Sequence, residues 1–194
     1  MKKLFLFSIL ILASCSNRSD FNLTAKSDIL DDEMVYLVQY KENVPILKDS
    51  AVVKDGVFKF TDSISVPEMH YVFFKNIKGN IPVVIEPGDI KLTVYKDSLR
   101  STKIDGTTSN DDFKTYIEES SSLINELNNI QNEINYNIAL NDSLLIDDLE
   151  KQFVNMRQRL TDYEFDFMKN KNDSYIAALI LQRMVFERSL DYDK

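Results

Sequence analysis

Residues suited to acid–base, nucleophilic or metal chemistry are scarce, because the chain contains one histidine, His70, and one cysteine, Cys15. A single cysteine excludes a disulfide within the chain, a Cys-x-x-Cys redox pair and a cysteine-based metal cage. His70 stands beside Tyr71 at the start of an apolar run, without a second histidine or a triad signature, so we predict a structural role in a strand. The sequence therefore predicts no catalytic residue, no cofactor and no metal ion, and we expect that the protein is not an enzyme.

Carboxylates are abundant, but no pair can be singled out among the 31 acidic residues as a hydrolytic site. Two acidic runs could bind a hard cation, yet both lack the alternate-residue spacing of a calcium loop. Two others are expected on the solvated faces of helices. In chain order the runs are Asp31-Asp32-Glu33, Asp111-Asp112, Glu118-Glu119, and Asp147-Asp148 with Glu150. The four glycines are scattered, which excludes a glycine-rich phosphate loop.

The N-terminus has the pattern of an export signal. Lys2 and Lys3 precede an apolar run over 4–12 that is too short to span a bilayer. The ending Leu12-Ala13-Ser14-Cys15 resembles the lipobox of bacterial lipoproteins. That resemblance implies a signal peptide over 1–14, acylation of Cys15 as the mature N-terminus, and a short tether over 15–20. The alternative is an ordinary signal peptide that contains a cysteine.

Charge and the residues after Cys15 suggest a location. Loss of residues 1–14 changes the net charge from −8 to −10, and an acidic surface repels nucleic acid and anionic headgroups. Acyl chains would then provide the membrane attachment. By comparison with lipoproteins, Ser16 favours the outer membrane, and the absence of an acidic run over 16–20 favours its periplasmic side.

A β pattern extends over 21–106. Phe21, Leu23 and Ala25 alternate with polar residues, as do Ile90, Leu92 and Val94. Asp55-Gly56 between two β-rich runs predicts a hairpin turn, and Pro87-Gly88 fits the centre of a type II turn. Seven or eight short strands at regular spacing predict an antiparallel β-sandwich.

A helical pattern follows over 107–194, so the fold class is α+β. Ser109 or Asn110 is expected to cap the first helix and 141–143 the second, and the two should form an antiparallel hairpin. Ser174 is expected to cap a third helix from Tyr175 to about Leu190. This third helix is apolar on nearly every side yet lies close to Lys194, so we expect a protein partner at the C-terminal helices.

Several short motifs keep a common order, and together they resemble a β-rich domain of unknown function. That domain occurs at the N-terminus of thioredoxin-like lipoproteins of the TlpA and ResA type in Gram-negative bacteria. The motifs are Val35-Tyr36-Leu37, Asp49-Ser50-Ala51, Asp55-Gly56-Val57-Phe58, Pro67, Glu86-Pro87-Gly88-Asp89 and Ile104-Asp105-Gly106-Thr107. The redox activity of that family is not expected here, because its dithiol is missing.

Two further patterns remain open. Asp-Ser followed by a small or aliphatic residue resembles an O-glycosylation signal of exported bacterial proteins, although turns and helix caps prefer the same pair. It occurs at Ser50, Ser63, Ser98 and Ser143. Tyr71, Phe73, Phe74 and Tyr95 could line a groove, but a place in the sandwich core is the favoured alternative.

The sequence thus predicts a cell-envelope lipoprotein that acts as a noncatalytic binding or scaffold module. The alternative is the detached N-terminal half of a thioredoxin-like thiol-disulfide oxidoreductase, which would work only beside a separately encoded redox domain.

Overall fold

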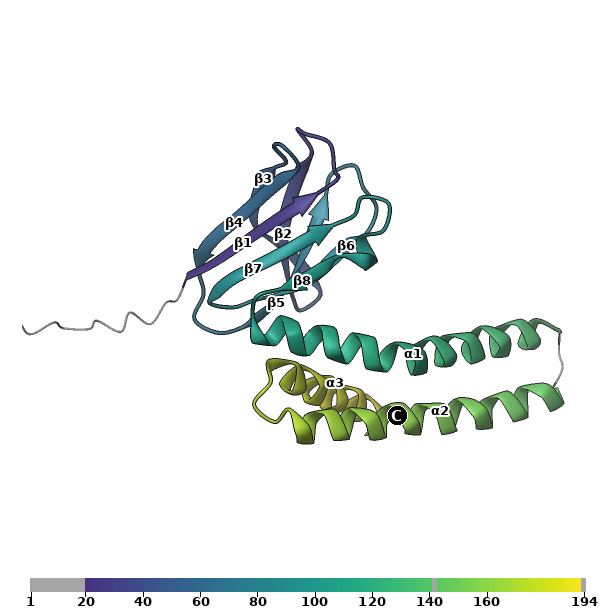
Figure 1. Cartoon of the computed structure of the whole chain (residues 1–194). Helices are drawn as coiled ribbons and strands as arrows, with labels where there is room; N and C mark the ends of the chain where they lie inside the picture. Colours follow the sequence, from purple (N-terminus) through teal and green to yellow (C-terminus); the bar gives the residue numbers. More distant parts are fainter. Residues whose placement is uncertain (1–19, 141–142, 193–194) are drawn as a thin grey trace, which may run out of the picture.

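A computed structural model of the chain describes residues 20–140 and 143–192 (Figure 1). These residues form two four-stranded sheets followed by three long helices, which confirms the predicted α+β fold. The strands are β1 (Asp20–Ser27), β2 (Met34–Lys41), β3 (Val44–Val52), β4 (Val57–Ser63), β5 (Glu68–Phe74), β6 (Asn80–Ile85), β7 (Gly88–Val94) and β8 (Lys103–Asp105). The helices are η1 (Leu99–Ser101), a 3-10 helix, then α1 (Thr108–Leu140), α2 (Ser143–Asn170) and α3 (Tyr175–Tyr192).

The two sheets have the orders β4-β1-β7-β8, called the β1 sheet below, and β3-β2-β5-β6, called the β2 sheet. All neighbouring strands are antiparallel except β1 and β7, which run parallel from Phe21 opposite Gly88 to Ser27 opposite Val94. A parallel pair requires a long connection, and here β2 to β6 supply it. The sandwich is therefore antiparallel apart from this pair.

The inner faces of the two sheets form one apolar core. Alternate residues of each strand point inward, because successive side chains of a strand lie on opposite faces. Phe58 of the β1 sheet packs edge-on against Phe74 of the β2 sheet, with 5.8 Å between ring centroids. The largest fully buried members of this core include Leu23, Val35, Leu37, Phe58, Phe60, Val72, Ile81, Ile85, Ile90 and Leu92.

The predicted turn at Asp55-Gly56 is present, but it connects the two sheets. Both residues have positive φ, 51° and 68°, as a type I′ turn requires, and Lys54 pairs with Val57. The strands on either side then separate, β3 into the β2 sheet and β4 into the β1 sheet. Gly56 also packs closely against β1, since a Cβ atom there would lie 2.7 Å from the Ser27 carbonyl oxygen.

The predicted helical hairpin is formed by α1 and α2, whose distal half extends beyond the sandwich (Figure 1). Its seam is apolar and consists of Leu123, Leu127, Ile130, Ile134, Leu149, Phe153 and Met156. This matches the spacing of apolar residues in both segments. No helix among the described residues combines the length and the apolar character that crossing a membrane requires.

The predicted cap of α1 is wrong by a few residues. The helix begins at Thr108, so Ser109 and Asn110 lie inside its first turn. Instead of capping it, they attach it to the sandwich, because tertiary hydrogen bonds take up both side chains. The predicted cap of α3 is confirmed, since the Ile176 N–H donates to Ser174 Oγ at 3.2 Å. Asn141 and Asp142 lie outside the described residues.

The junction between sandwich and helices is specific. The Asn110 side chain accepts from the Val84 N–H at 2.9 Å and donates to the Val84 carbonyl at 2.7 Å. Ser109 donates through its N–H and its hydroxyl to the Glu86 carboxylate, at 2.8 and 2.5 Å. Beyond these bonds, Val84 packs with apolar residues of α2 and α3, so the helices cover one end of the β2 sheet.

Candidate interaction surface

The outer face of the β1 sheet is polar. Strand register places Thr24 opposite both Lys59 and Lys91, and Asn22 opposite Asp89, to which it donates a hydrogen bond of 3.2 Å. The outward residues include Asn22, Thr24 and Lys26 of β1, Val57, Lys59 and Thr61 of β4, Asp89, Lys91 and Thr93 of β7, and Lys103 and Asp105 of β8. Such a face is well suited to water.

The outer face of the β2 sheet has the opposite character. Register places Tyr36 opposite Phe73 and Val38 opposite both Tyr71 and Leu47. The outward residues include Tyr36, Val38 and Tyr40 of β2, Pro45, Leu47 and Ser50 of β3, Met69, Tyr71 and Phe73 of β5, and Pro82 and Val84 of β6. None of them is charged, although charged residues make up 28% of the chain. We call these residues the apolar face.

The apolar face is open to solvent at Tyr40 and along β3, whereas its other residues are half-buried or, at Val84, buried. Tyr40 is 45% exposed and Leu47 60% exposed, while Tyr36, Tyr71 and Phe73 are half-buried against each other. Tyr40 and Tyr71 meet edge to face, with 5.2 Å between ring centroids. Exposed apolar patches of this kind mark interaction sites in soluble domains, so this face is the candidate functional site.

Tyrosine hydroxyls differ between this face and the helices. In the helices, Tyr116 donates to Glu164 at 2.7 Å and Tyr163 to Glu119 at 3.0 Å. On the apolar face, the described residues supply no hydrogen-bond partner to the hydroxyls of Tyr36, Tyr40 or Tyr71. These three rings therefore offer both apolar area and a free hydroxyl, the combination that enriches tyrosine at interfaces.

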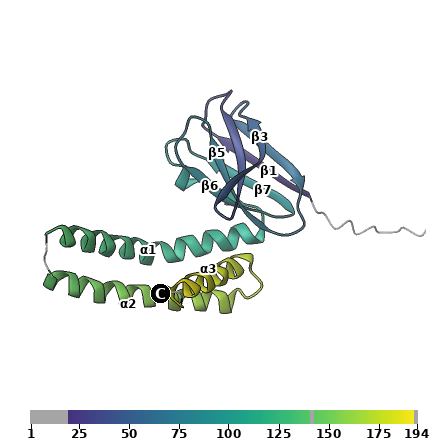
Figure 2. The same ribbon diagram turned by 180° about the vertical axis from the view of Figure 1, so that it is seen from behind.

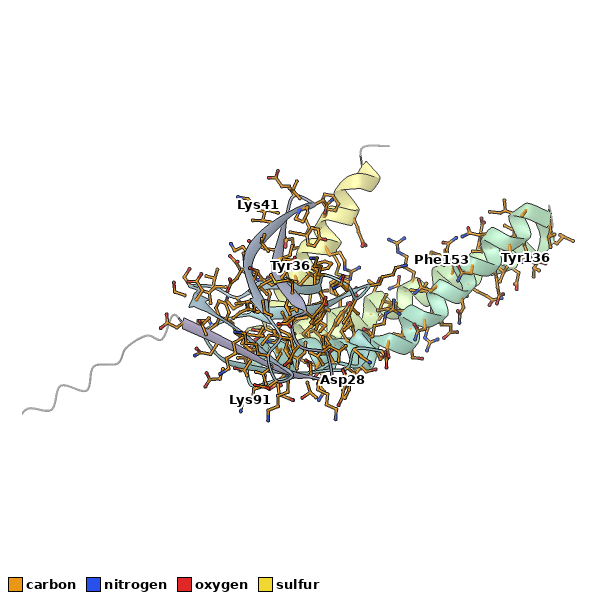
Figure 3. All side chains as sticks on the ribbon, turned by 90° about the horizontal axis from the view of Figure 1, so that it is seen from above. Asp28, Tyr36, Lys41, Lys91, Tyr136 and Phe153 are labelled. Atoms are coloured by element: carbon orange, nitrogen blue, oxygen red, sulfur yellow. The ribbon has the colours of Figure 1, made fainter. Side chains whose placement is uncertain are left out.

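Helix α3 covers only the end of the apolar face. The Tyr175 hydroxyl accepts from the Met69 N–H at 3.0 Å, and burial raises the pKa of Tyr175. Ile176 and Ile180 pack around Val84. Figure 2 shows α3 in front of α2, on the side of the molecule where β5 and β6 face the viewer. Seen from above, α3 projects on the same side as Tyr36 and Lys41 of β2 (Figure 3).

The helices are joined by a buried polar network. Glu164, 2% exposed, accepts from Tyr116 and from Arg183 of α3, the latter at 2.5 Å. Burial, together with the bond to Glu164, raises the pKa of Tyr116. Each member has a partner, so this network holds three helices in place and offers no free acid or base.

His70 lies in the sandwich core on β5 and is buried. Its Nδ1 lies 3.2 Å from the Glu68 carbonyl oxygen, and its Nε2 lies 4.0 Å from the Glu68 carboxylate. Burial is the main cause that lowers the pKa of His70, and the carbonyl bond and the Glu68 charge act against it. This position fits the predicted structural role in a strand.

The acidic runs are separated in the structure. Glu33 accepts from the N–H and side-chain amide of Asn76 at 2.7 and 2.8 Å, which fixes a loop. Asp112 is buried and pairs with Lys171 at 2.8 Å. Asp148 accepts from Gln152 one helical turn away. Within the part of the chain that the structure describes, no three His, Cys, Asp or Glu side chains come together in a way that could hold a metal ion.

The aromatic set expected from the sequence is divided. Phe74 belongs to the core, Tyr71 and Phe73 belong to the apolar face, and Tyr95 lies apart beyond the end of β7. The sequence missed Tyr36 and Tyr40 as their neighbours. The sequence did contain a signal for an apolar outer face. Residues 71–74 are apolar at successive positions, whereas a strand with one solvated face alternates between apolar and polar residues, as Ile90 to Val94 does.

Of the four Asp-Ser positions, Ser50, Ser63 and Ser98 are exposed, and the Ser143 side chain lies outside the described residues. Cys15 also lies outside them. A groove of ≈ 650 Å³ lies where the sandwich meets the helices, and its lining includes Pro67, Glu86, Asp112, Ser174 and Leu181. The carboxylates of Glu86 and Asp112 are already bonded to Ser109 and Lys171.

Comparison with protein families gives a match over the sandwich region. Residues 21–113 match the model of a domain of unknown function, DUF4369, so the match extends from β1 into the first turns of α1. The comparison with curated proteins gave no match. The protein is therefore an α+β chain whose β-sandwich region is similar to the DUF4369 domain.

Proposed function

We propose that this protein is a lipid-anchored, noncatalytic binding or scaffold module of the bacterial cell envelope, and that the apolar face is its binding surface. The observation that carries the proposal is an open, uncharged sheet face on a chain of net charge −8. Water-exposed apolar area costs free energy, and a bound partner recovers it, at about 25 cal/mol per Å² buried. The exposed side of α3, with Leu181 and Val185, extends the area available to a protein partner.

The membrane part of the proposal rests on the lipobox-like ending at Cys15. Acylation there would place the sandwich close to the membrane through the tether over 15–20, in the outer membrane on its periplasmic side. Labelling cells with radioactive palmitate tests this point. Label is expected in the wild-type chain and not in Cys15→Ser, and an unlabelled wild-type chain would reject the anchor.

The binding surface is tested by a pull-down from detergent-solubilised envelopes with the tagged full chain. The double variant Tyr40→Asp, Leu47→Asp places two charges on the apolar face. Its matched control, Thr61→Asp with Thr93→Asp, places the same charges on exposed positions of the β1 sheet. We expect the first variant to lose the bound proteins and the control to retain them. Equal sets of bound proteins from the two variants would refute the proposal.

A second candidate function is the detached N-terminal half of a thioredoxin-like oxidoreductase of the TlpA and ResA type. It is supported by the order of the short motifs between Val35 and Thr107, which resembles that of those lipoproteins. The DUF4369 match covers the same region but carries no function of its own. The chain itself lacks the dithiol that such chemistry needs. A Cys-x-x-Cys coding region directly after the Lys194 codon would favour this function over the first.

A further inference from the structure

We propose that a second copy of this chain covers the apolar face, with the outer side of α3 of each copy lying on the sheet of the other. The inference rests on the proposed function, because it assigns an occupant to the same face. Each chain has an open sheet face and an exposed helix side. In a two-fold symmetric dimer, the helix side of each copy can contact the sheet face of the other, so the same contact forms twice.

The first argument is continuity with an interface that the chain already forms. Its own α3 packs on the end of the β2 sheet, around Met69 and Val84. The next outward residues on the same strands, Tyr71 and Pro82, have the same apolar character but lie beyond this helix-covered cluster. A second helix beside α3 would extend the helix layer over the sheet.

The second argument is the outer side of α3. Ala178, Leu181 and Val185 are spaced by three and four residues, so they lie on one side of the helix. Leu181 is 53% and Val185 61% exposed, whereas Ile176 and Ile180 on the other side are buried. This exposed apolar stripe has the character of a core-facing helix surface.

The third argument is charge. The residues of the apolar face are uncharged, and so are Ala178, Leu181 and Val185 of α3. Arg183, the charged residue of α3 between Tyr175 and Phe186, is bonded to Glu164. The groove beside Leu181 contains the carboxylates of Glu86 and Asp112, but these are bonded to Ser109 and Lys171. The chain itself provides an uncharged match for the apolar residues of each surface. Since every copy has a net charge of −8, two copies repel at long range, and salt should strengthen their association by screening that repulsion.

Cross-linking tests the contact directly, because Cys15→Ala removes the one thiol of the chain. In that full-length background, copies carrying Tyr40→Cys are mixed with copies carrying Leu181→Cys and treated with a short bismaleimide. We expect a covalent dimer of the two. The control mixture of Thr61→Cys with Leu181→Cys, in which Thr61 lies on the β1 sheet, should remain uncross-linked. Equal yields from both mixtures would overturn the inference.

The second readout is the molecular mass of the full chain in detergent, measured by light scattering. It is measured at about 0.05 M and about 0.5 M NaCl, between which the Debye length changes roughly threefold. We expect dimers that tighten severalfold at high salt, and about a hundredfold weaker association for Tyr40→Asp, Leu47→Asp. A wild-type chain that stays monomeric, or weakens with salt, rejects the second copy as occupant. In that case the proposed function still stands if the pull-down yields other proteins that depend on the apolar face.

Discussion

The outer faces of the two sheets show how one fold can present two different surfaces. Both sheets have four strands, and both contribute the same kind of inner face to a shared core. Outside, the β1 sheet presents lysines, threonines and aspartates, while the β2 sheet presents tyrosines and aliphatic side chains. Core packing therefore does not explain the apolar face, since the β1 sheet folds without one. This difference between the two outer faces is the observation behind the proposed binding surface.

The largest effect is expected where the β2 sheet is already covered. Val84→Asp would bury a carboxylate among α2 and α3, and should lower the free energy of unfolding by about 4 kcal/mol or more, or prevent folding. The matched change Thr93→Asp on the exposed face of the β1 sheet should stay within about 0.5 kcal/mol. Urea denaturation followed by circular dichroism measures both. Similar losses of unfolding free energy in the two variants would contradict the distinction between a covered and an exposed face.

A smaller loss of stability is expected when the junction between the covered end of the β2 sheet and α1 is weakened. Asn110→Ala removes the bonds to both backbone groups of Val84 and leaves them buried without partners, which should cost roughly 2–4 kcal/mol. Asn125 lies on the same helix and is exposed, so Asn125→Ala serves as the control and should change little. If the two variants melt alike, Asn110 does not hold the helices to the sandwich.

The pH dependence of the unfolding free energy tests His70, which is buried on the inner side of the β2 sheet. Because burial lowers the pKa of His70, the unfolded chain binds a proton more readily than the folded one. The contribution of His70 is therefore fully present above a pH of about 6.5 and declines as the pH falls below that value, by at most about 1.4 kcal/mol per pH unit.

The charged groups that act on His70 are the Glu68 carboxylate and the Lys48 ammonium, and Gln39 donates to Glu68 at 2.8 Å. His70→Gln should flatten the difference in unfolding free energy between pH 7 and pH 5 relative to the wild type. Parallel pH profiles for the two proteins would contradict the assignment.

The smallest expected effect concerns glycosylation and its influence on association. Ser50 is exposed and pairs with Tyr36 on the apolar face, whereas Ser63 ends β4 of the β1 sheet. If the Asp-Ser pattern is used, intact mass of protein purified from its own cells should exceed the sequence mass by whole hexose units. Ser50→Ala would then remove one glycan and should increase association through the apolar face, while Ser63→Ala should not. A native mass without added sugar removes the hypothesis.

Most of the sandwich could be predicted from the sequence, since strands with one buried face carry a two-residue period that local sequence displays. The missed part was most of β3, because the sequence indicated only a β-rich run directly before the turn at Asp55-Gly56. Its residues 44–50 are exposed at the edge of the sheet, so burial imposes no alternation on them. Pro45 and Lys48 in this strand are typical of edges that avoid pairing with other chains.

The sequence by itself determined the fold class, the helical hairpin, the turn at Asp55-Gly56 and the cap at Ser174, because each depends on periodicity or on a local backbone preference. Only the tertiary structure decided that β1 pairs with β7 in parallel, that Asn110 bonds to Val84 instead of capping α1, and that Tyr36 and Tyr71 share an open face. These features join residues far apart in the chain, and the register of strands from different segments is fixed by the packing of the whole sandwich.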